Sequence, residues 1–217
     1  MRKILQKVFS IFEKKGLQAP SKKRKSTGQS LVEFAIAFPI LIIMLSGVVE
    51  FGFILNYYLS LLDSTREAAR FYSGLDPFNA DLTDNMSFYS GAAAMVRANL
   101  DPSVVNPDYE GRRIVLDPAL DDVIITVFSV LNDEVIQSYP SSGEYHMYNN
   151  FDSIFAEANS MQNSLLANSP NAGILVVEVH YNYHQVLALP WLTAFLSDPL
   201  PLRAYTIFPL SAAEPIE

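Results

Sequence analysis

The sequence contains no cysteine, and it contains no lysine after Lys25. The lack of cysteine excludes disulfides and thiolate metal sites, although an exported domain of this size can be held together by an ordinary apolar core. The six basic residues that follow Gly28 are all arginines, scattered among 22 acidic residues. Phosphate binding needs clustered Lys and Arg, so we expect no nucleic-acid partner for this part of the chain.

Charge is distributed very unevenly along the chain. Residues 1–28 contain nine Lys or Arg and one acid, a net charge of +8, whereas residues 29–217 carry a net charge of -16. Basic residues that flank a membrane span stay on the cytoplasmic side. The pattern therefore predicts a cytoplasmic basic leader and an acidic remainder outside the cell membrane.

An apolar run long enough to cross a membrane follows the leader. Sixteen uncharged residues, Phe34–Val49, are followed after Glu50 by twelve more, Phe51–Leu62. A bilayer core of about 30 Å needs roughly 20 apolar helical residues. We therefore expect a single-pass transmembrane helix from Gln29, and strong helix formers beyond the run extend it to about Tyr72.

Glu33 lies near the start of this run, where an acidic residue is costly and is by default a hypothesis about function. The alternative is a carboxylate at the inner interface that snorkels to water or is protonated. Pro39 removes one helical hydrogen bond and should bend the helix within the membrane. Small residues that would permit close packing against a neighbouring helix are Ala35, Ala37, Ser46 and Gly47.

Three charged residues farther along the helix are candidates for docking. Glu50 is expected near the outer interface, either as an ordinary solvated residue or in contact with another helix. Arg66 and Arg70 have acidic residues three positions before them, so they form either an exposed, locally paired surface or a contact with the acidic domain or a partner.

The rest of the chain alternates helix and strand patterns, which predicts an α+β fold. The expected helices cover residues 86–100, 150–166 and 190–196, and the expected strands cover 123–131, 134–139, 173–187 and 203–210. Asn132-Asp133 is a plausible hairpin turn. The predicted organisation is a leader at 1–28, the transmembrane helix and its outward extension at 29–74, and an exported domain with an antiparallel sheet at 75–217.

No pattern in the sequence indicates catalysis, a cofactor or a metal. His180 and His184 share one face of a predicted strand, but they are too far apart for one metal at about 3.3 Å per residue, so both are expected to face solvent. Asp121-Asp122 lacks the alternating oxygen ligands of a calcium loop and predicts a turn. We therefore expect a protein that is not an enzyme.

Residues Gly28 to Gly74 resemble a known family, the TadE-type pseudopilins of the tight-adherence branch of type IV pili. The resemblance rests on Gly28 followed by a polar residue, Glu33 five places later, Pro39 in the apolar run, GVVEFG at 47–52 and EAAR at 67–70. Beyond Gly74 the likeness is limited to the late strand with its tyrosines, the segment after Pro190 and the final strand.

The resemblance implies cleavage between Gly28 and Gln29 by a prepilin peptidase at the cytoplasmic face of the inner membrane. The new α-amino group of Gln29 would then pair with Glu33 of the same or a neighbouring subunit. Implied partners are the peptidase, other pilin or pseudopilin subunits and the inner-membrane assembly platform, and the exported domain would be pilin-like. The alternatives are a permanently anchored binding or sensor domain and, less favoured, an anchored enzyme.

Overall fold

The structure is a computed structural model that describes residues 27–155, 160–165 and 170–215. Of the predicted leader, only Thr27 and Gly28 lie within these ranges. The chain divides into two compact units, with the boundary between Met44 and Leu45. The predicted boundaries at residues 28 and 74 are a different division, based on the expected position of the membrane, and they stay a prediction.

The first element is the long helix α2, Thr27–Tyr72, which contains Pro39. Its bounds agree closely with the helix predicted from Gln29 to about Tyr72. Among the described residues it is the one helix that is long and apolar enough to cross a membrane, judged by length and composition. It therefore suggests a single-pass membrane anchor.

The helix α3, Met86–Leu100, begins and ends where the sequence predicted. Asn85 caps it, because the Asn85 side-chain oxygen accepts a hydrogen bond from the Ser87 backbone N–H at 3.2 Å. The side chains of Ala92 and Ala93 are completely buried. A Cβ at Gly91 would collide with the Tyr72 hydroxyl, so glycine permits the end of α2 to pack closely on α3.

Five antiparallel strands form a single sheet in the order β2-β1-β4-β5, with β3 also paired to β1. The strands are β1 (Asp122–Leu131), β2 (Glu134–Tyr139), β3 (Tyr145–His146), β4 (Ala172–Tyr183) and β5 (Leu200–Pro209). Short helical turns lie between or after them: η1 (Pro102–Val104), η2 (Gln162–Ser164), α4 (Pro190–Thr193) and η3 (Ser211–Ala213). The α+β class predicted from the sequence is confirmed.

The hairpin between β1 and β2 turns at the predicted dipeptide. Asn132 and Asp133 have φ angles of 50° and 66°. Two residues with positive φ form the kind of turn whose twist matches that of antiparallel strands, and Asn and Asp tolerate this conformation better than most residues. The local sequence thus determines where the chain reverses.

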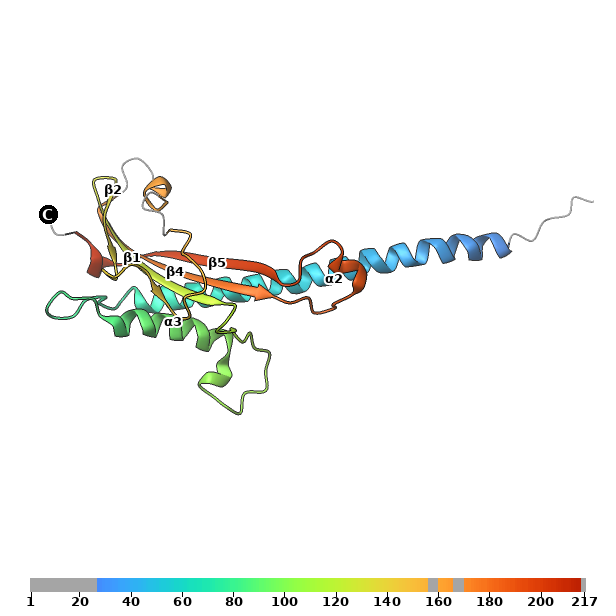
Figure 1. The fold of residues 1–217 in the computed structure, drawn as a ribbon, viewed down its shortest axis with the longest axis horizontal. Coiled ribbons are helices and arrows are strands. Elements are labelled where there is room, and N and C mark those ends of the chain that lie inside the picture. The colour runs from blue at the N-terminus through green and yellow to red at the C-terminus, as the bar shows by residue number, and fades with distance from the viewer. Residues whose placement is uncertain (1–26, 156–159, 166–169, 216–217) are drawn as a thin grey trace, which may run out of the picture. The chain divides into compact units, whose positions relative to one another are not determined.

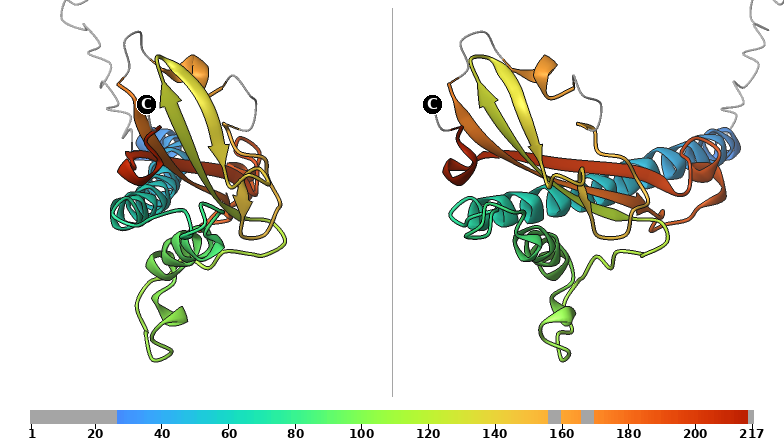
Figure 2. Two further views of the ribbon diagram at one scale, coloured as in Figure 1. Left: turned by 90° about the vertical axis from the view of Figure 1, so that its left-hand side faces the viewer. Right: turned by 60° about the vertical axis from the view of Figure 1, so that its left-hand side comes forward.

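The sheet has two faces with different neighbours. One face packs against α2 and α3 (Figures 1 and 2), and its buried β1 and β4 residues are Val123, Ile125, Val127, Leu175, Val177 and Val179. On the opposite face, Phe128 and Val176 form a second apolar cluster with Phe155 and Met161. The alternation along β1 and β4 therefore contributes to two cores, as expected for strands covered on both sides.

The helix predicted at 150–166 is wrong for residues 150–155 and 160–165, which form bends, turns and the short helical turn η2, and residues 156–159 and 166 lie outside the described residues. The physical reason is a buried carboxylate. Glu178 of β4 accepts hydrogen bonds from the Ser153 hydroxyl and the Ile154 backbone N–H. These donors are available because the segment crosses the sheet in an irregular conformation. The two-residue strand β3 was not among the predicted strands.

Candidate functional site

The N-terminal turn of α2 contains the residues of the predicted processing site. Gly28 and Gln29 are exposed and helical. The Gln29 side-chain amide donates a hydrogen bond to the Glu33 carboxylate at 3.0 Å, and both residues are exposed. The structure thus places Gln29 and Glu33 on the same side of the first turns. Cleavage after Gly28 and pairing of Glu33 with an α-amino group stay predictions.

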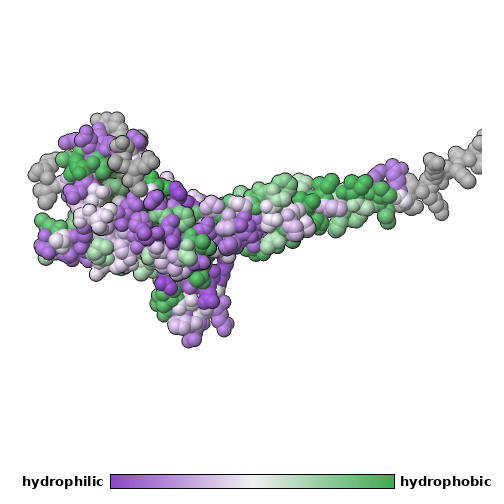
Figure 3. Space-filling view, in the orientation of Figure 1, coloured by the Kyte–Doolittle hydropathy of each residue, from purple (hydrophilic) through white to green (hydrophobic). Residues whose placement is uncertain are grey.

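Apart from Glu33, the residues of α2 between Leu31 and Leu45 are all uncharged and apolar. Except for the partly buried Ile42, the large hydrophobic side chains there are exposed to between 41% and 69%. Figure 3 shows the hydrophobic colouring along this stretch. The small residues Ala35 and Ala37 and the ring of Pro39 are also exposed. Packing of these residues against another subunit's helix stays a prediction.

Glu50 is fully buried inside the second unit, and this placement differs from both sequence-based interpretations of the residue. Its Oε1 accepts hydrogen bonds from the Tyr183 hydroxyl at 2.6 Å and the Val186 N–H at 2.9 Å, and its Oε2 accepts one from the Leu187 N–H at 2.9 Å. A buried carboxylate requires such donors. Burial, together with the bond to Glu50, raises the pKa of Tyr183. We call Glu50 and these three donors the Glu50 clasp.

One turn before Glu50, a second hydrogen bond joins α2 to the same part of the chain. The indole N–H of Trp191 donates to the Ser46 hydroxyl at 3.0 Å. Ser46 is only 8% exposed, so it packs against its own chain and the prediction that it contacts a neighbouring transmembrane helix is wrong. A Cβ at Gly47 would meet open space, and this side of the helix remains accessible.

Aromatic side chains extend the contact between α2 and β4. The ring of Tyr57 stacks on Tyr181 at 5.9 Å and lies edge-on to Tyr183 at 5.0 Å. The Arg112 guanidinium lies 4.5 Å from the Tyr57 ring centre, a cation–π geometry. Burial raises the pKa of Tyr181 to about 12. This cluster and the Glu50 clasp together fix α2 to the sheet.

Arg66 and Arg70 lie on the exposed side of α2. Arg66 is 3.7 Å from Asp63, and Arg70 is 2.9 Å from Glu67. This is the locally paired surface that the sequence analysis offered as one interpretation. Docking of either arginine onto a partner stays a prediction.

A network of carboxylates and histidines lies on the sheet face that is turned away from α2. Asp122 accepts hydrogen bonds from the backbone N–H groups of Tyr148 and Asn150 at 2.9 and 3.0 Å. His146 lies between Asp122 and Glu144, at 3.3 and 3.4 Å. Burial raises the pKa of Glu144. This network ties the segment after β3 to the sheet.

Two sequence predictions in this region need correction. Asp122 begins strand β1 and is completely buried, so Asp121-Asp122 is not a simple surface turn. His180 is only 3% exposed and stacks on Phe151 at 4.8 Å, whereas the prediction placed it in solvent. His184 does face solvent, next to Asp198. Alternation along β4 was predicted correctly, but the segment that covers the second face was not recognised.

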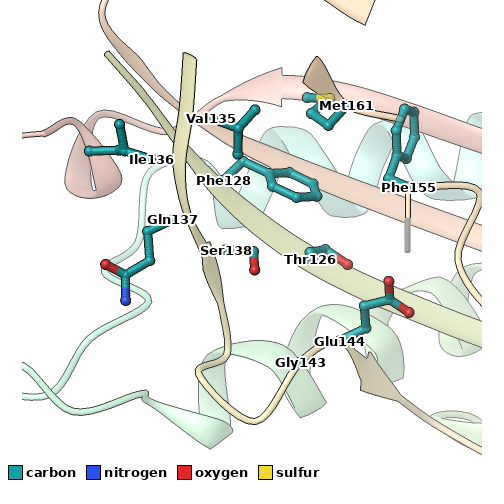
Figure 4. Close-up of a pocket in the computed structure, with 10 residues that line it drawn as sticks. All are labelled: Thr126, Phe128, Val135, Ile136, Gln137, Ser138, Gly143, Glu144, Phe155 and Met161. Atoms are coloured by element: carbon teal, nitrogen blue, oxygen red, sulfur yellow. The ribbon is translucent and has the colours of Figure 1, made fainter. Parts of the chain in front are cut away.

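A cavity of about 470 Å³ opens on this second face (Figure 4). Phe128, Phe155 and Met161 line its apolar part, and Thr126 and Glu144 lie in its polar part. Within the described ranges, the buried Thr126 hydroxyl has no hydrogen-bond partner. The same ranges hold no group of three His, Asp or Glu side chains able to bind a metal ion. The expectation of no cofactor and no metal stays a prediction.

The residues that sequence reasoning missed are the donors of the Glu50 clasp. Tyr183, Val186 and Leu187 lie 133 to 137 positions after Glu50. The sequence does hold one signal, an acidic residue that interrupts two uncharged runs and therefore needs a partner. It holds no indication of which distant segment supplies that partner, because two of the three donors are backbone N–H groups.

Comparison with known proteins gave one match. Residues 28–70 match the model of the family described as TadE-like protein, in agreement with the resemblance found in the sequence. Neither the comparison with curated proteins nor that with solved structures gave a match. The segment from Gly28 to Arg70, about a fifth of the chain, is therefore similar to TadE-like proteins, which suggests involvement in a tight-adherence pilus system.

Proposed function

We propose that this protein is a membrane-anchored minor pseudopilin that contributes to assembly of a tight-adherence-type pilus. The observation that carries the proposal is the family match, which begins at Gly28 and includes Glu33 and the EAAR sequence at 67–70. The exposed apolar surface between Leu31 and Leu45 supports it, because such a surface requires lipid or apolar partners around it.

In this proposal a prepilin peptidase cleaves the chain between Gly28 and Gln29 at the cytoplasmic face. The basic leader stays inside the cell membrane and the acidic domain lies outside it. Glu33 then forms a charge pair with the new α-amino group, because a lone carboxylate is costly in a low-dielectric setting. Assembly proceeds through α2, together with other pilin or pseudopilin subunits and the inner-membrane platform. The protein has no catalytic activity of its own.

The first test is the N-terminal sequence and intact mass of the protein from cells that also express a prepilin peptidase. The expected chain begins at Gln29. A Gly28→Leu variant should remain uncleaved, because the peptidase needs a residue without a side chain next to the bond, and a Gly16→Leu variant should be cleaved normally. A wild-type chain that still begins at Met1 beside an active peptidase would favour a permanently anchored binding or sensor domain.

The second test concerns assembly. A Glu33→Ala variant should insert in the membrane but abolish piliation in its native host. Glu134→Ala, which removes an exposed carboxylate outside the segment that matches the family, should leave piliation unchanged. Normal piliation by the Glu33 variant would remove the proposed role of this carboxylate.

A further inference from the structure

The connection between β4 and β5, residues 184–199, has an unusual composition for a surface segment. From Gln185 to Ser197 it contains no charged residue. Two of its large apolar side chains are nevertheless exposed, Phe195 to 83% and Val186 to 48%. An uncharged surface segment with exposed aromatic and aliphatic side chains indicates a contact with an apolar partner.

The β4–β5 connection is attached to one short stretch of α2. Val186 and Leu187 donate their backbone N–H groups to Glu50, and Trp191 donates its indole N–H to Ser46. Figure 1 shows the connection, coloured orange to red, beside α2. Its two ends are joined by His184 and Asp198, whose side chains are 2.9 Å apart. The exposed apolar side chains are therefore held at the level of Ser46 and Glu50.

That level coincides with the end of a membrane-length run. Ser46 and Glu50 are 17 and 21 residues after Gln29, and about 20 helical residues at 1.5 Å each cross a hydrocarbon core of about 30 Å. In a chain whose α2 enters the membrane at Gln29, the connection thus reaches the opposite interface. Trp and other aromatic residues are favoured at this depth, where an apolar ring and a polar edge are both accommodated.

We propose that the β4–β5 connection is a second membrane contact, which rests in the interfacial layer of the outer face of the bilayer through Phe195, Val186 and Trp191. The inference rests on the membrane anchoring proposed above. Lipid is the partner because the segment is attached to Ser46 and Glu50, a membrane-length run after Gln29, and carries no charge between Gln185 and Ser197. The contact would hold the outer domain against the membrane surface in addition to the single helix.

Tryptophan fluorescence offers a direct test, because Trp191 is the only tryptophan in the chain. The full-length protein is reconstituted in phosphatidylcholine vesicles with either ordinary or brominated acyl chains. A Trp191→Phe/Phe195→Trp variant reports on the exposed position, and Trp191→Phe/Phe71→Trp is the matched control, because Phe71 is also exposed, to 57%, but lies 21 residues beyond Glu50 on α2. Resistance to carbonate extraction measures insertion of α2 separately.

The expected result is a blue-shifted emission at position 195 that brominated lipid quenches and that aqueous acrylamide quenches weakly. Position 71 should show the opposite behaviour. If α2 is inserted but acrylamide quenches the fluorescence at position 195 as strongly as at position 71, the second membrane contact is absent and the α2 anchor is still supported. Shielding of position 195 from both quenchers would mean that protein covers it, which also overturns a lipid contact. Extraction of the whole protein by carbonate would contradict both the anchor and the second contact.

Discussion

The stretches of α2 before and after Leu45 belong to one helix but bury their side chains in different ways. Before Leu45 the large apolar residues are exposed, except for the partly buried Ile42. After it, burial follows one stripe at helical spacing, formed by Ser46, Glu50, Leu61, Thr65 and Ala68. The difference shows that a helix with apolar side chains all round indicates an apolar surrounding. A helix with one buried stripe of side chains, even one that includes a carboxylate, indicates packing against a protein interior.

The largest expected effects come from placing the same charge in each stretch. Leu61→Asp should unfold the outer domain, because Leu61 is completely buried. Loss of the leucine side chain together with burial of an unpaired charge lowers the free energy of unfolding by about 4 kcal/mol or more. Leu41→Asp should leave that domain folded and weaken membrane insertion, by about 2.5 to 3.5 kcal/mol if it lies at the centre of the span. Urea unfolding and carbonate extraction separate the two effects.

Leu59→Asp is the matched control for this pair, since Leu59 is on the second stretch and is 46% exposed. It should change neither measurement substantially. If either Leu59→Asp or Leu41→Asp unfolded the outer domain, the division of α2 into two differently surrounded stretches would be incorrect.

Replacement of the buried carboxylate tests the second stretch alone. Glu50→Gln places an amide where two N–H groups and a hydroxyl donate, so one donor faces another donor. We expect a loss of about 2 to 3 kcal/mol in the free energy of unfolding of the outer domain. Urea unfolding of the full chain in detergent measures this loss. Glu67→Gln on the exposed surface should change stability by less than about 0.5 kcal/mol.

Tyr183→Phe should have a smaller effect than Glu50→Gln. It removes one hydrogen bond to a charged group, worth about 1.5 kcal/mol, and leaves the two backbone donors in place. Combined with Glu50→Gln in a double-mutant cycle, it should lose less than the sum of the single effects, because the residues are in contact. Fully additive losses would contradict the bond between Glu50 and Tyr183.

The smallest effect is expected on the far face of the sheet. Burial raises the folded pKa of Glu144 above its ordinary value of 4.5. The stabilising contribution of this group is complete below pH 4.5 and is lost as pH rises through the folded pKa. Glu144→Gln stays neutral, so its stability relative to the wild type should increase between pH 4.5 and 7. Thermal unfolding across this range, with exposed Glu134→Gln as control, measures the change.

Local patterns predicted most elements of this fold. Helical formers and a capping Asn85 determine α3, and Asn132-Asp133 determine the β1–β2 turn. The sequence could not predict the course of residues 150–155, because it depends on the buried Glu178 of a distant strand. The end of β4 at Tyr183 was missed for the same reason, since Val186 and Leu187 donate to Glu50 instead of pairing with a strand.

The candidate site divides in the same way. The apolar run, the basic leader and Glu33 are consecutive in sequence and could be interpreted without a structure. The Glu50 clasp joins residues 133 to 137 positions apart, and its recognition required the fold.

The long sequence separation within the Glu50 clasp has a consequence for synthesis. Leu187 emerges from the ribosome 137 residues after Glu50, a delay on the order of 10 s at typical translation rates. Until then Glu50 is a hydrated carboxylate, which resists movement into the hydrocarbon core. In the proposed topology, the charge first limits how far the nascent helix enters the hydrocarbon core and only later becomes part of the folded interior. One side chain thus acts at two separate stages of the protein's biogenesis.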